Sequence, residues 1–247
     1  MALVSIIMPT YNNSAFIPAA IESVLNQTVT DWELEIIDDC SNDNTSEVLQ
    51  TYLERYPRIH YTRLHKNAGV AAARTEGVNK ATGKYIAFLD SDDIWCPEKL
   101  EHQLRLQEAS GADLIYTGAR CMNHNGELLE KYFKVPAKVN YRSLLGGNDI
   151  ICSSVLVKCE VIRQFPMKRS DLHEDYICWL SILKAGYTAV GINKPLLHYR
   201  LAKNSKSRKK LKSANKTYLV YKYMKVPLPV RWKSFFLYAI HGWKRYF

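Results

Sequence analysis

The segment KYIAFLDSDD, residues 84–93, is an apolar run that ends in a cluster of aspartates. The apolar part predicts a buried strand over 84–90. Asp90, Asp92 and Asp93 follow closely, and carboxylates this crowded repel each other unless a cation joins them. A D-x-D pattern of oxygen ligands suits Mg²⁺ or Mn²⁺ bound together with a phosphate substrate. The segment alone is equally compatible with aspartates that cap a helix beginning near Pro97.

The residues before this segment alternate regularly between strand and helix patterns. The predicted strands are 3–8, 32–38, 59–64 and 84–90, and the predicted helices are 14–27, 44–56 and 70–81. Strands that alternate with helices in this way are parallel and are joined by right-handed crossovers. The first ninety residues therefore predict an α/β fold with a mostly parallel central sheet flanked by helices.

The chain beyond Pro97 has a less regular pattern. A helix is expected up to about residue 110, and NHNGE at 123–127 is typical of a hairpin turn. The other elements predicted here are strands over 112–118, 151–158, 187–193 and 195–201, and a helix over 173–186. The last helix pattern ends at a glycine, as helices commonly do.

The composition excludes several classes of protein. Of the 247 residues, 47% are hydrophobic and 23% are charged, which is typical of a globular protein. No apolar stretch approaches the roughly 20 residues of a membrane-spanning helix. The first residues, MALVSIIMPTYNN, have no basic leader, and their apolar run is too short for a signal peptide. We therefore expect a cytosolic chain. The six cysteines form no C-x-x-C pair, which predicts reduced and mostly packed thiols.

Polar residues follow each of the four predicted parallel strands. The four clusters are PTYNN (9–13), DDCSND (38–43), HKNAG (65–69) and DSDD (90–93). Since ligands of open α/β sheets bind beyond the carboxyl ends of the strands, these clusters predict one binding crevice. A carboxylate of Asp38 or Asp39 can accept hydrogen bonds from a nucleobase or ribose, although residues 39–43 also suit a simple turn.

Arg74 supplies a positive charge near this edge, one turn into a helix that opens at Gly69. Helix N-termini and arginine side chains both favour phosphate, although an exposed helix face is an equally good interpretation of Arg74 alone. The sequence has neither the G-x-G-x-x-G pattern of a dinucleotide-binding fold nor the G-K-S/T motif of a P-loop, so neither of these nucleotide-binding classes is predicted.

The four motifs SIIMPTYNN, IIDDCSNDNT, NAGVAAAR and AFLDSDDIW, in this order and spacing, resemble the family 2 inverting glycosyltransferases of the GT-A fold. The resemblance covers about residues 3–200. It implies a catalytic domain over 1–200, with a nucleotide-binding half (1–95) and an acceptor-binding half (96–200). A basic helical tail over 201–247 would follow.

The resemblance also implies roles for individual residues. Pro9 and Tyr11 would lie against the nucleobase, usually uracil, and Asp39 would form a hydrogen bond to it. Arg74 would lie near the base or the phosphates. Cys40 departs from the family, which usually has glycine after the paired aspartates, and we expect the turn to persist at some backbone cost.

The D-x-D pair would bind the donor. Asp92 would hold a divalent metal, Mn²⁺ or Mg²⁺, on the donor diphosphate. Asp90 would bind either the ribose or that metal.

An inverting transferase also needs a base for the acceptor hydroxyl, and the resemblance assigns it to DLHEDYICWL, residues 171–180. Asp175 is the expected base, with Glu174 as an auxiliary residue. The alternative is that these acidic residues only favour the first turn of a helix. His198 and Arg200 match loosely a stretch that reaches back to the diphosphate, and a structural strand end explains them equally well.

The C-terminal tail differs in charge from the rest of the chain. After residue 197 there are 14 lysines and arginines and no acidic residue, whereas 20 basic and 24 acidic residues precede it. From residue 231 a helical pattern places aromatic residues on one face and basic residues on the other. The apolar face comprises Trp232, Phe235, Phe236, Ala239, Ile240, Trp243, Tyr246 and Phe247, and the basic face comprises Arg231, Lys233, His241, Lys244 and Arg245.

Such a cationic amphipathic helix predicts binding of residues 203–247 to an anionic membrane surface. Packing of the aromatic face on the body is the alternative. Nucleic acid is not expected as a partner, because no recognised motif accompanies the charge. Processive synthases of the family carry spanning helices and a Q-x-x-R-W motif, and here Leu228 stands where the glutamine would be.

The sequence therefore predicts a metal-dependent inverting glycosyltransferase. It would move one sugar from a nucleotide-sugar donor, a UDP-sugar, to a glycan or lipid-linked oligosaccharide in bacterial surface polysaccharide synthesis. The enzyme would be cytoplasmic and peripheral on the inner face of the cell membrane. A nucleotidyltransferase would need a glycine-rich phosphate loop that PTYNNSAF (9–16) lacks. A catalytically inactive membrane-surface module that binds sugar or lipid is the alternative of a different class.

Overall fold

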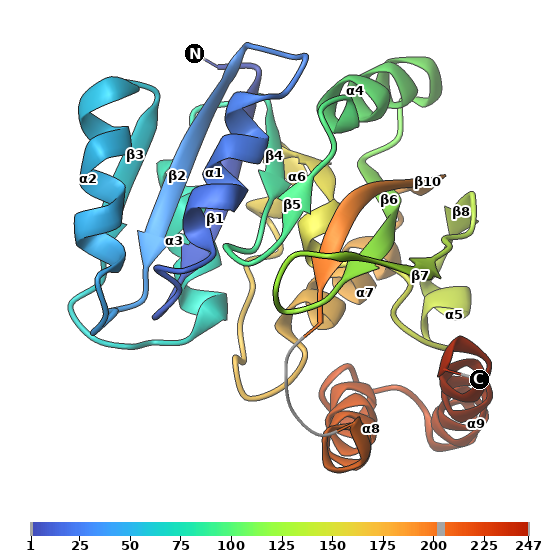
Figure 1. Cartoon of the computed structure of the whole chain (residues 1–247). Coiled ribbons are helices and arrows are strands. Elements are labelled where there is room, and N and C mark those ends of the chain that lie inside the picture. Colours follow the sequence, from blue (N-terminus) through green and yellow to red (C-terminus); the bar gives the residue numbers. More distant parts are fainter. Residues whose placement is uncertain (1, 202–205, 247) are drawn as a thin grey trace.

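The structure, a computed structural model, describes residues 2–201 and 206–246 (Figure 1). Ten strands of the described chain form one mixed sheet, in which β7 pairs with β6 and β8 with β10 beside the main order. That main order is β3 (Ile59–Arg63), β2 (Trp32–Asp38), β1 (Val4–Thr10), β4 (Tyr85–Phe88), β9 (Leu156–Lys158), β6 (Leu114–Met122), β10 (Ala189–Arg200) and β5 (Ile94–Trp95). The side strands are β7 (Leu128–Phe133) and β8 (Lys138–Val139).

The first half of the sheet confirms the predicted alternation. Strands β1 to β4 are parallel, and the crossover helices are α1 (Ile17–Leu25), α2 (Thr45–Arg55) and α3 (Val70–Lys80). Every residue of β1 and of β2 is buried, because helices cover both faces of the sheet. Burial on both faces explains why these strands are continuous apolar runs rather than alternating patterns.

The second half of the sheet contains most of the antiparallel pairs. β9 pairs antiparallel with both β4 and β6, whereas β6 and β10 are parallel. The pairing of β4 with β9 makes the sheet continuous from the first half of the chain to the second. β10 is one long strand where two strands were predicted, with irregular register around Pro195.

The predicted strand over 151–158 was wrong in its first half. Residues Cys152–Ser154 form a 3-10 turn, η1, and the strand begins only at Leu156. The Ser154 hydroxyl donates to the carbonyl of Ile151 at 2.7 Å, which is a local bond that competes with a strand ladder. The short helices α5 (Tyr141–Leu144) and α6 (Cys159–Ile162) were not predicted either.

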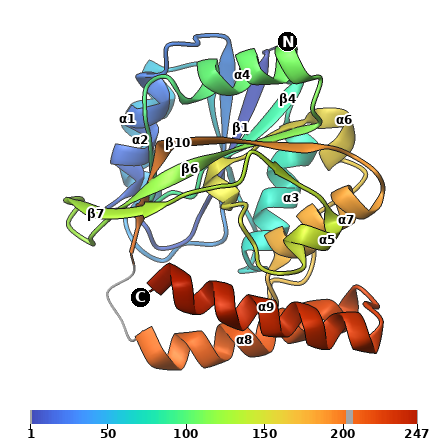
Figure 2. The same ribbon diagram turned by 90° about the vertical axis from the view of Figure 1, so that its right-hand side faces the viewer.

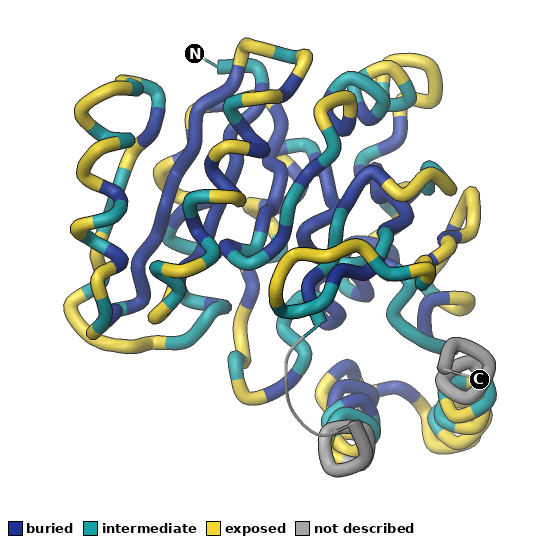
Figure 3. The backbone as a smooth tube through the Cα atoms, viewed as in Figure 1, coloured by how far each residue is buried: buried dark blue, intermediate teal, exposed yellow. Residues whose placement is uncertain are grey.

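Two hydrophobic cores lie on opposite faces of the sheet. Helices α1 and α2 pack on one face together with α4 (Lys99–Ser110). Helices α3 and α6 pack on the other face together with α7 (Glu174–Lys184). Figure 2 shows these layers edge-on, and Figure 3 shows that the buried chain follows the central strands.

The C-terminal tail forms two helices, α8 (Lys206–Tyr223) and α9 (Leu228–Tyr246), which lie side by side at the end of the molecule toward which the parallel strands run (Figures 1 and 2). Val220 and Tyr221 of α8 are completely buried and belong to the same core as α7. Helix α8 therefore packs on the body, whereas the predicted aromatic face belongs to α9.

Helix α9 confirms the predicted helix, but its aromatic face is divided. Phe235 packs partly against the core, whereas Trp232 and Phe236 are 59% and 67% exposed. Three residues of the predicted aromatic face (Trp243, Tyr246 and Phe247) and three of the predicted basic face (His241, Lys244 and Arg245) have side chains that lie outside the described residues. Among the described residues, no helix is long and apolar enough to cross a membrane.

Candidate active site

The loops that follow β1 and β2 are joined by hydrogen bonds. The Asn12 backbone N–H donates to the Ser41 hydroxyl at 2.9 Å, and the Asn42 N–H donates to the Asn12 side chain at 2.7 Å. These bonds fix the loop that carries Tyr11, a residue that is 47% exposed, and its contact with a nucleobase stays a prediction. Pro9 is buried within β1 opposite Ile37, so it supports this loop from inside the sheet.

Asp39 holds the next loop. Its two carboxylate oxygens accept the backbone N–H groups of Ala68 and Gly69 at 2.7 and 2.8 Å. Each oxygen has a second lone pair, so the hydrogen bond to a nucleobase stays a prediction. Gly69 has φ +87°, and a Cβ there would lie 2.5 Å from the Ser170 hydroxyl, so only glycine fits this position. Cys40 adopts φ +66°, and the turn therefore forms despite the side chain.

The D-x-D turn is fixed from three sides. The Asp90 N–H donates to the Ser153 hydroxyl at 3.0 Å, and the Asn13 amide donates to the Ser91 hydroxyl at 2.7 Å. On the third side, the Arg200 guanidinium donates to the Asp92 carbonyl at 2.7 Å. The backbone of the turn that carries the carboxylates is therefore held in place by these bonds.

The charge of this turn fits a cation. Burial and repulsion from Asp90 raise the pKa of Asp92 to about 6. The positive charges of the protein therefore do not fully stabilise the ionised form of this carboxylate. The donors are carboxylate oxygens, which are the preferred ligands of Mg²⁺ and Mn²⁺. Asp92 and Asp90 together therefore suit a hard divalent metal.

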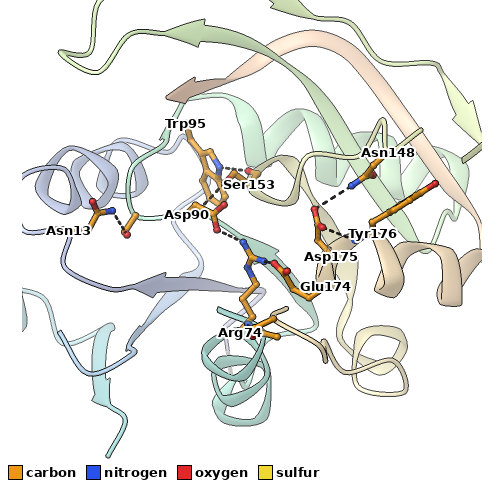
Figure 4. A network of polar contacts seen from close by, with 12 residues as sticks. Asn13, Arg74, Asp90, Trp95, Asn148, Ser153, Glu174, Asp175 and Tyr176 are labelled. Carbon is orange, nitrogen blue, oxygen red and sulfur yellow. Dashed lines mark hydrogen bonds and ion pairs between the residues drawn. The ribbon is translucent and has the colours of Figure 1, made fainter. Parts of the chain in front are cut away.

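Arg74 connects the two halves of the chain. Its guanidinium bonds Asp90 Oδ1 and Glu174 Oε1, each at 2.6 Å, and the residue is only 4% exposed (Figure 4). Burial alone would lower the pKa of Arg74, but the two carboxylates raise it well above its ordinary value. Both partners of Arg74 in this bridge are carboxylates, so its predicted contact with base or phosphate would be added to the bridge.

Asp175 lies next to this bridge, in the first turn of α7 (Figure 4). Its Oδ1 accepts the Tyr176 N–H at 2.7 Å, and its Oδ2 lies 3.4 Å from the Asn148 amide nitrogen. Burial raises the pKa of Asp175, although Arg74 opposes this shift. A raised pKa makes a carboxylate a stronger proton acceptor, and its activity as a base falls as the pH drops through that pKa.

The two auxiliary residues on β10 contact protein groups. The His198 ring lies 3.6 Å from the Cys96 sulfur, and its backbone pairs with Ile94 of β5. The Arg200 guanidinium also donates to the His124 carbonyl at 2.8 Å, so it ties the D-x-D turn to the β6–β7 hairpin. A direct contact of either residue with the diphosphate stays a prediction.

Sequence reasoning missed Asn148 and Ser153, which contact Asp175 and Asp90. Ser153 had a signal, because two adjacent serines inside the apolar run ICSSVLV need buried hydrogen-bond partners. Asn148 lies in an irregular loop, and no periodicity marks it.

Comparisons with known proteins show which family the chain resembles. The family model described as "Glycosyl transferase family 2" matches residues 5–164. The chain is 40% identical over 220 residues to the putative teichuronic acid biosynthesis glycosyltransferase TuaG of Bacillus subtilis, covering 89% of this chain and 87% of that one. It is 37% identical over 213 residues to the Escherichia coli UDP-Glc:alpha-D-GlcNAc-diphosphoundecaprenol beta-1,3-glucosyltransferase WfgD, covering 85% and 81%.

A solved structure shares the fold. The mannosyltransferase PcManGT from Pyrobaculum calidifontis, in complex with GDP-Man and Mn²⁺, superposes with a TM-score of 0.74 at 17% identity. The match covers 96% of this chain and 70% of that one. The mixed α/β architecture described above is the GT-A fold, as the sequence predicted.

Proposed function

Because this chain belongs to glycosyl transferase family 2, we propose that it transfers one sugar, with inversion, from a UDP-sugar to a lipid-linked glycan. The chain is a glycosyltransferase, and its relatives include enzymes of teichuronic acid and diphosphoundecaprenol-linked synthesis. The proposal adds the donor nucleotide, the metal, the stereochemistry and the acceptor class.

The proposal depends above all on the Asp90–Arg74–Glu174 bridge, which places the D-x-D turn beside Asp175. A donor held at one end of this bridge would present its sugar to an acceptor at the other end. Asp175 removes the proton from the acceptor hydroxyl as that oxygen attacks the anomeric carbon. The attack comes from the side opposite the diphosphate, so one displacement inverts the configuration.

The remaining residues orient the donor. Tyr11 and Asp39 bind the base, Asp90 binds the ribose or the metal, and Asp92 holds the metal. When bound, this Mn²⁺ or Mg²⁺ supplies positive charge to the leaving diphosphate. Glu174 keeps Arg74 in place, and Arg200 keeps the Asp92 turn in place.

Calorimetric titration with UDP, GDP, CDP and dTDP tests this function. We expect UDP to bind in the presence of Mn²⁺ and to lose most of its affinity in EDTA, because a metal is needed between Asp92 and the diphosphate. Asp92→Asn should lose the metal-dependent part of the affinity, since the metal site loses a charged ligand.

Asp113→Asn is the matched control, because Asp113 pairs with Lys158 away from the D-x-D turn. Metal-dependent binding of another nucleotide would keep the enzyme class and correct the role of Asp39. If none of the four nucleotides binds, the donor site proposed at the D-x-D turn is wrong.

We also propose that α9 holds the enzyme on the inner face of the cell membrane. Leu228, Trp232 and Phe236 are four residues apart on one side of α9 and are all well exposed. The tail around them has only basic charges, which suits an anionic surface. An acceptor with a lipid anchor would reach the crevice from that surface, because α8 and α9 lie at the end toward which the parallel strands run.

The double variant Trp232→Ser/Phe236→Ser is expected to bind phosphatidylglycerol-containing vesicles at least tenfold more weakly than the wild type. Burial of each large apolar side chain stabilises such binding by roughly 1.5–3 kcal/mol. Cosedimentation measures this loss, and Tyr132→Ser controls for an exposed aromatic residue on β7. Equal binding of the variant and the wild type would show that this face does not contact the membrane.

A further inference from the structure

Helix α8 contacts the segments on both sides of Asp175. Ser213 of α8 lies within hydrogen-bond distance of His173, with 3.3 Å between the hydroxyl and the ring Nε2. The Tyr221 ring packs edge-on against Tyr176, with their centroids 6.5 Å apart. His173 and Tyr176 flank Glu174 and Asp175 in the sequence, so the tail helix lies against the start of the helix that carries the base.

Tyr221 also fixes the loop that faces Asp175 from the other side. Its hydroxyl donates to the Leu145 carbonyl at 2.5 Å, and the Tyr176 hydroxyl donates to the Leu144 carbonyl at 2.7 Å. These carbonyls lie at the end of α5, where helical carbonyls lack partners within the helix. Two buried tyrosine hydroxyls therefore hold the end of α5 and the start of the loop that follows it.

That loop carries Asn148, whose amide nitrogen faces Asp175 Oδ2 at 3.4 Å. The Asn148 side-chain oxygen accepts the Ile150 N–H at 3.1 Å, so the amide is oriented with its nitrogen toward the carboxylate. A donor at this position favours the ionised form of the base. The contacts run from Tyr221 through Leu145 to Asn148 and on to Asp175.

We propose that Tyr221 is a positioning residue, which holds the Asn148 loop so that its amide donates to the general base. The proposal rests on the function proposed above, because it needs Asp175 to be the base. It makes the C-terminal tail part of the catalytic apparatus as well as a membrane contact. The ring of Tyr221 packs in the hydrophobic core, and its hydroxyl donates to the Leu145 carbonyl at the start of the loop.

The other charged groups around Asp175 stay in place when this hydroxyl is removed. Arg74 favours the ionised base, while Glu174 and Asp90 lie in the same cluster as like charges. None of these three residues contacts Tyr221 directly in the described structure. Tyr176 does contact Tyr221, and its N–H donates to Asp175, so the exchange at 145–149 and the Asn148→Ala variant are needed to assign a change in the base to the loop.

The test uses the full chain with the single substitution Tyr221→Phe, which keeps the ring and removes the hydroxyl. We expect kcat/KM for UDP-glucose and a GlcNAc-diphospholipid acceptor to fall roughly five- to tenfold, the size of one buried hydrogen bond. The acid limb of the pH profile should move to higher pH, because a base that loses a donor binds its proton more tightly. Amide hydrogen exchange at 145–149 should become faster.

Tyr218→Phe is the matched control, since Tyr218 is on the same helix and packs its ring against Phe235 of α9. It should change neither the pH limb nor the exchange at 145–149. Asn148→Ala should move the acid limb of the pH profile to higher pH, as Tyr221→Phe does. The double variant Tyr221→Phe/Asn148→Ala should move it no further than Asn148→Ala alone, because both substitutions remove the same hydrogen bond to Asp175.

The proposal is overturned if Tyr221→Phe lowers stability and activity but leaves the acid limb where it is in the wild type. It is also overturned if exchange at 145–149 is unchanged. A wild-type chain that transfers no sugar from any UDP-sugar would instead reject the proposed function, and the exchange experiment would then decide whether Tyr221 holds the loop.

Discussion

Asp175→Asn is expected to slow sugar transfer by about 10²- to 10⁴-fold, which is the usual contribution of a positioned general base. The amide has nearly the same shape as the carboxylate, and its oxygen can still accept the Tyr176 N–H. Its NH2 group would face the Asn148 amide nitrogen as a second donor, so that contact is lost, and the amide cannot accept the proton of the acceptor hydroxyl. Release of UDP measures the loss, with UDP-glucose and a GlcNAc-diphospholipid, the substrates in the name of the Escherichia coli relative WfgD, as probes. Binding of UDP with Mn²⁺ should match the wild type, since the donor residues are unchanged.

Asp171→Asn provides the control for this substitution. Asp171 precedes the same helix but is exposed and pairs only locally with Arg169. It should keep normal activity. If Asp175→Asn retains both transfer and binding, the base is another group, and the loop argument for Tyr221 fails with it.

The pH profile adds an independent check on Asp175. Burial raises the pKa of this carboxyl above that of a free aspartate, so the base becomes protonated at a higher pH than usual. Activity should therefore be complete well above the raised pKa and should decline as the pH falls through it. Asp175→Asn should lose this acid limb together with most of the rate.

Arg74→Met is expected to destabilise the fold by about 3 kcal/mol, the lower end of the range for broken buried ion pairs, because it leaves two partly buried carboxylates without their buried cation. Asp90 and Glu174 both depend on this guanidinium, and neither is fully exposed. Urea unfolding should show a lower midpoint with an unchanged slope. Part of the loss should be recovered near pH 5, since carboxylates that lose their partner bind protons more readily in the folded state than in the unfolded chain.

Arg105→Met is the matched control for this ion pair. Arg105 contacts Glu101 at the same 2.6 Å, but its side chain is 73% exposed. Exposed pairs contribute only about 0–1 kcal/mol, so this variant should unfold close to the wild-type midpoint. Equal losses in the two variants would contradict the view that Arg74 bridges the halves of the site.

Local patterns were sufficient for much of the fold. β1 to β4 and the helices between them were predicted close to their observed bounds, because continuous apolar runs and helical periodicity are properties of neighbouring residues. The strand expected over 151–158 failed in its first part, where serine hydroxyls form a turn. The small elements α5, α6 and β8 are only two to four residues long, too short for a helical or alternating pattern, although Asn140 and Ser143 form a capping box at the start of α5.

The sequence alone indicated the family, the sheet edge that forms the site, and the chemistry of Asp90, Asp92 and Asp175, since residue types and their order at strand ends carry that information. The partners of these residues came from the tertiary structure. Ser153 bonds the Asp90 N–H, Arg200 holds the Asp92 turn, and Tyr221 bonds the Leu145 carbonyl at the start of the loop that carries Asn148. Contacts between residues far apart in the chain depend on how the helices and strands pack, and the spacing of residues along the sequence does not predict that packing.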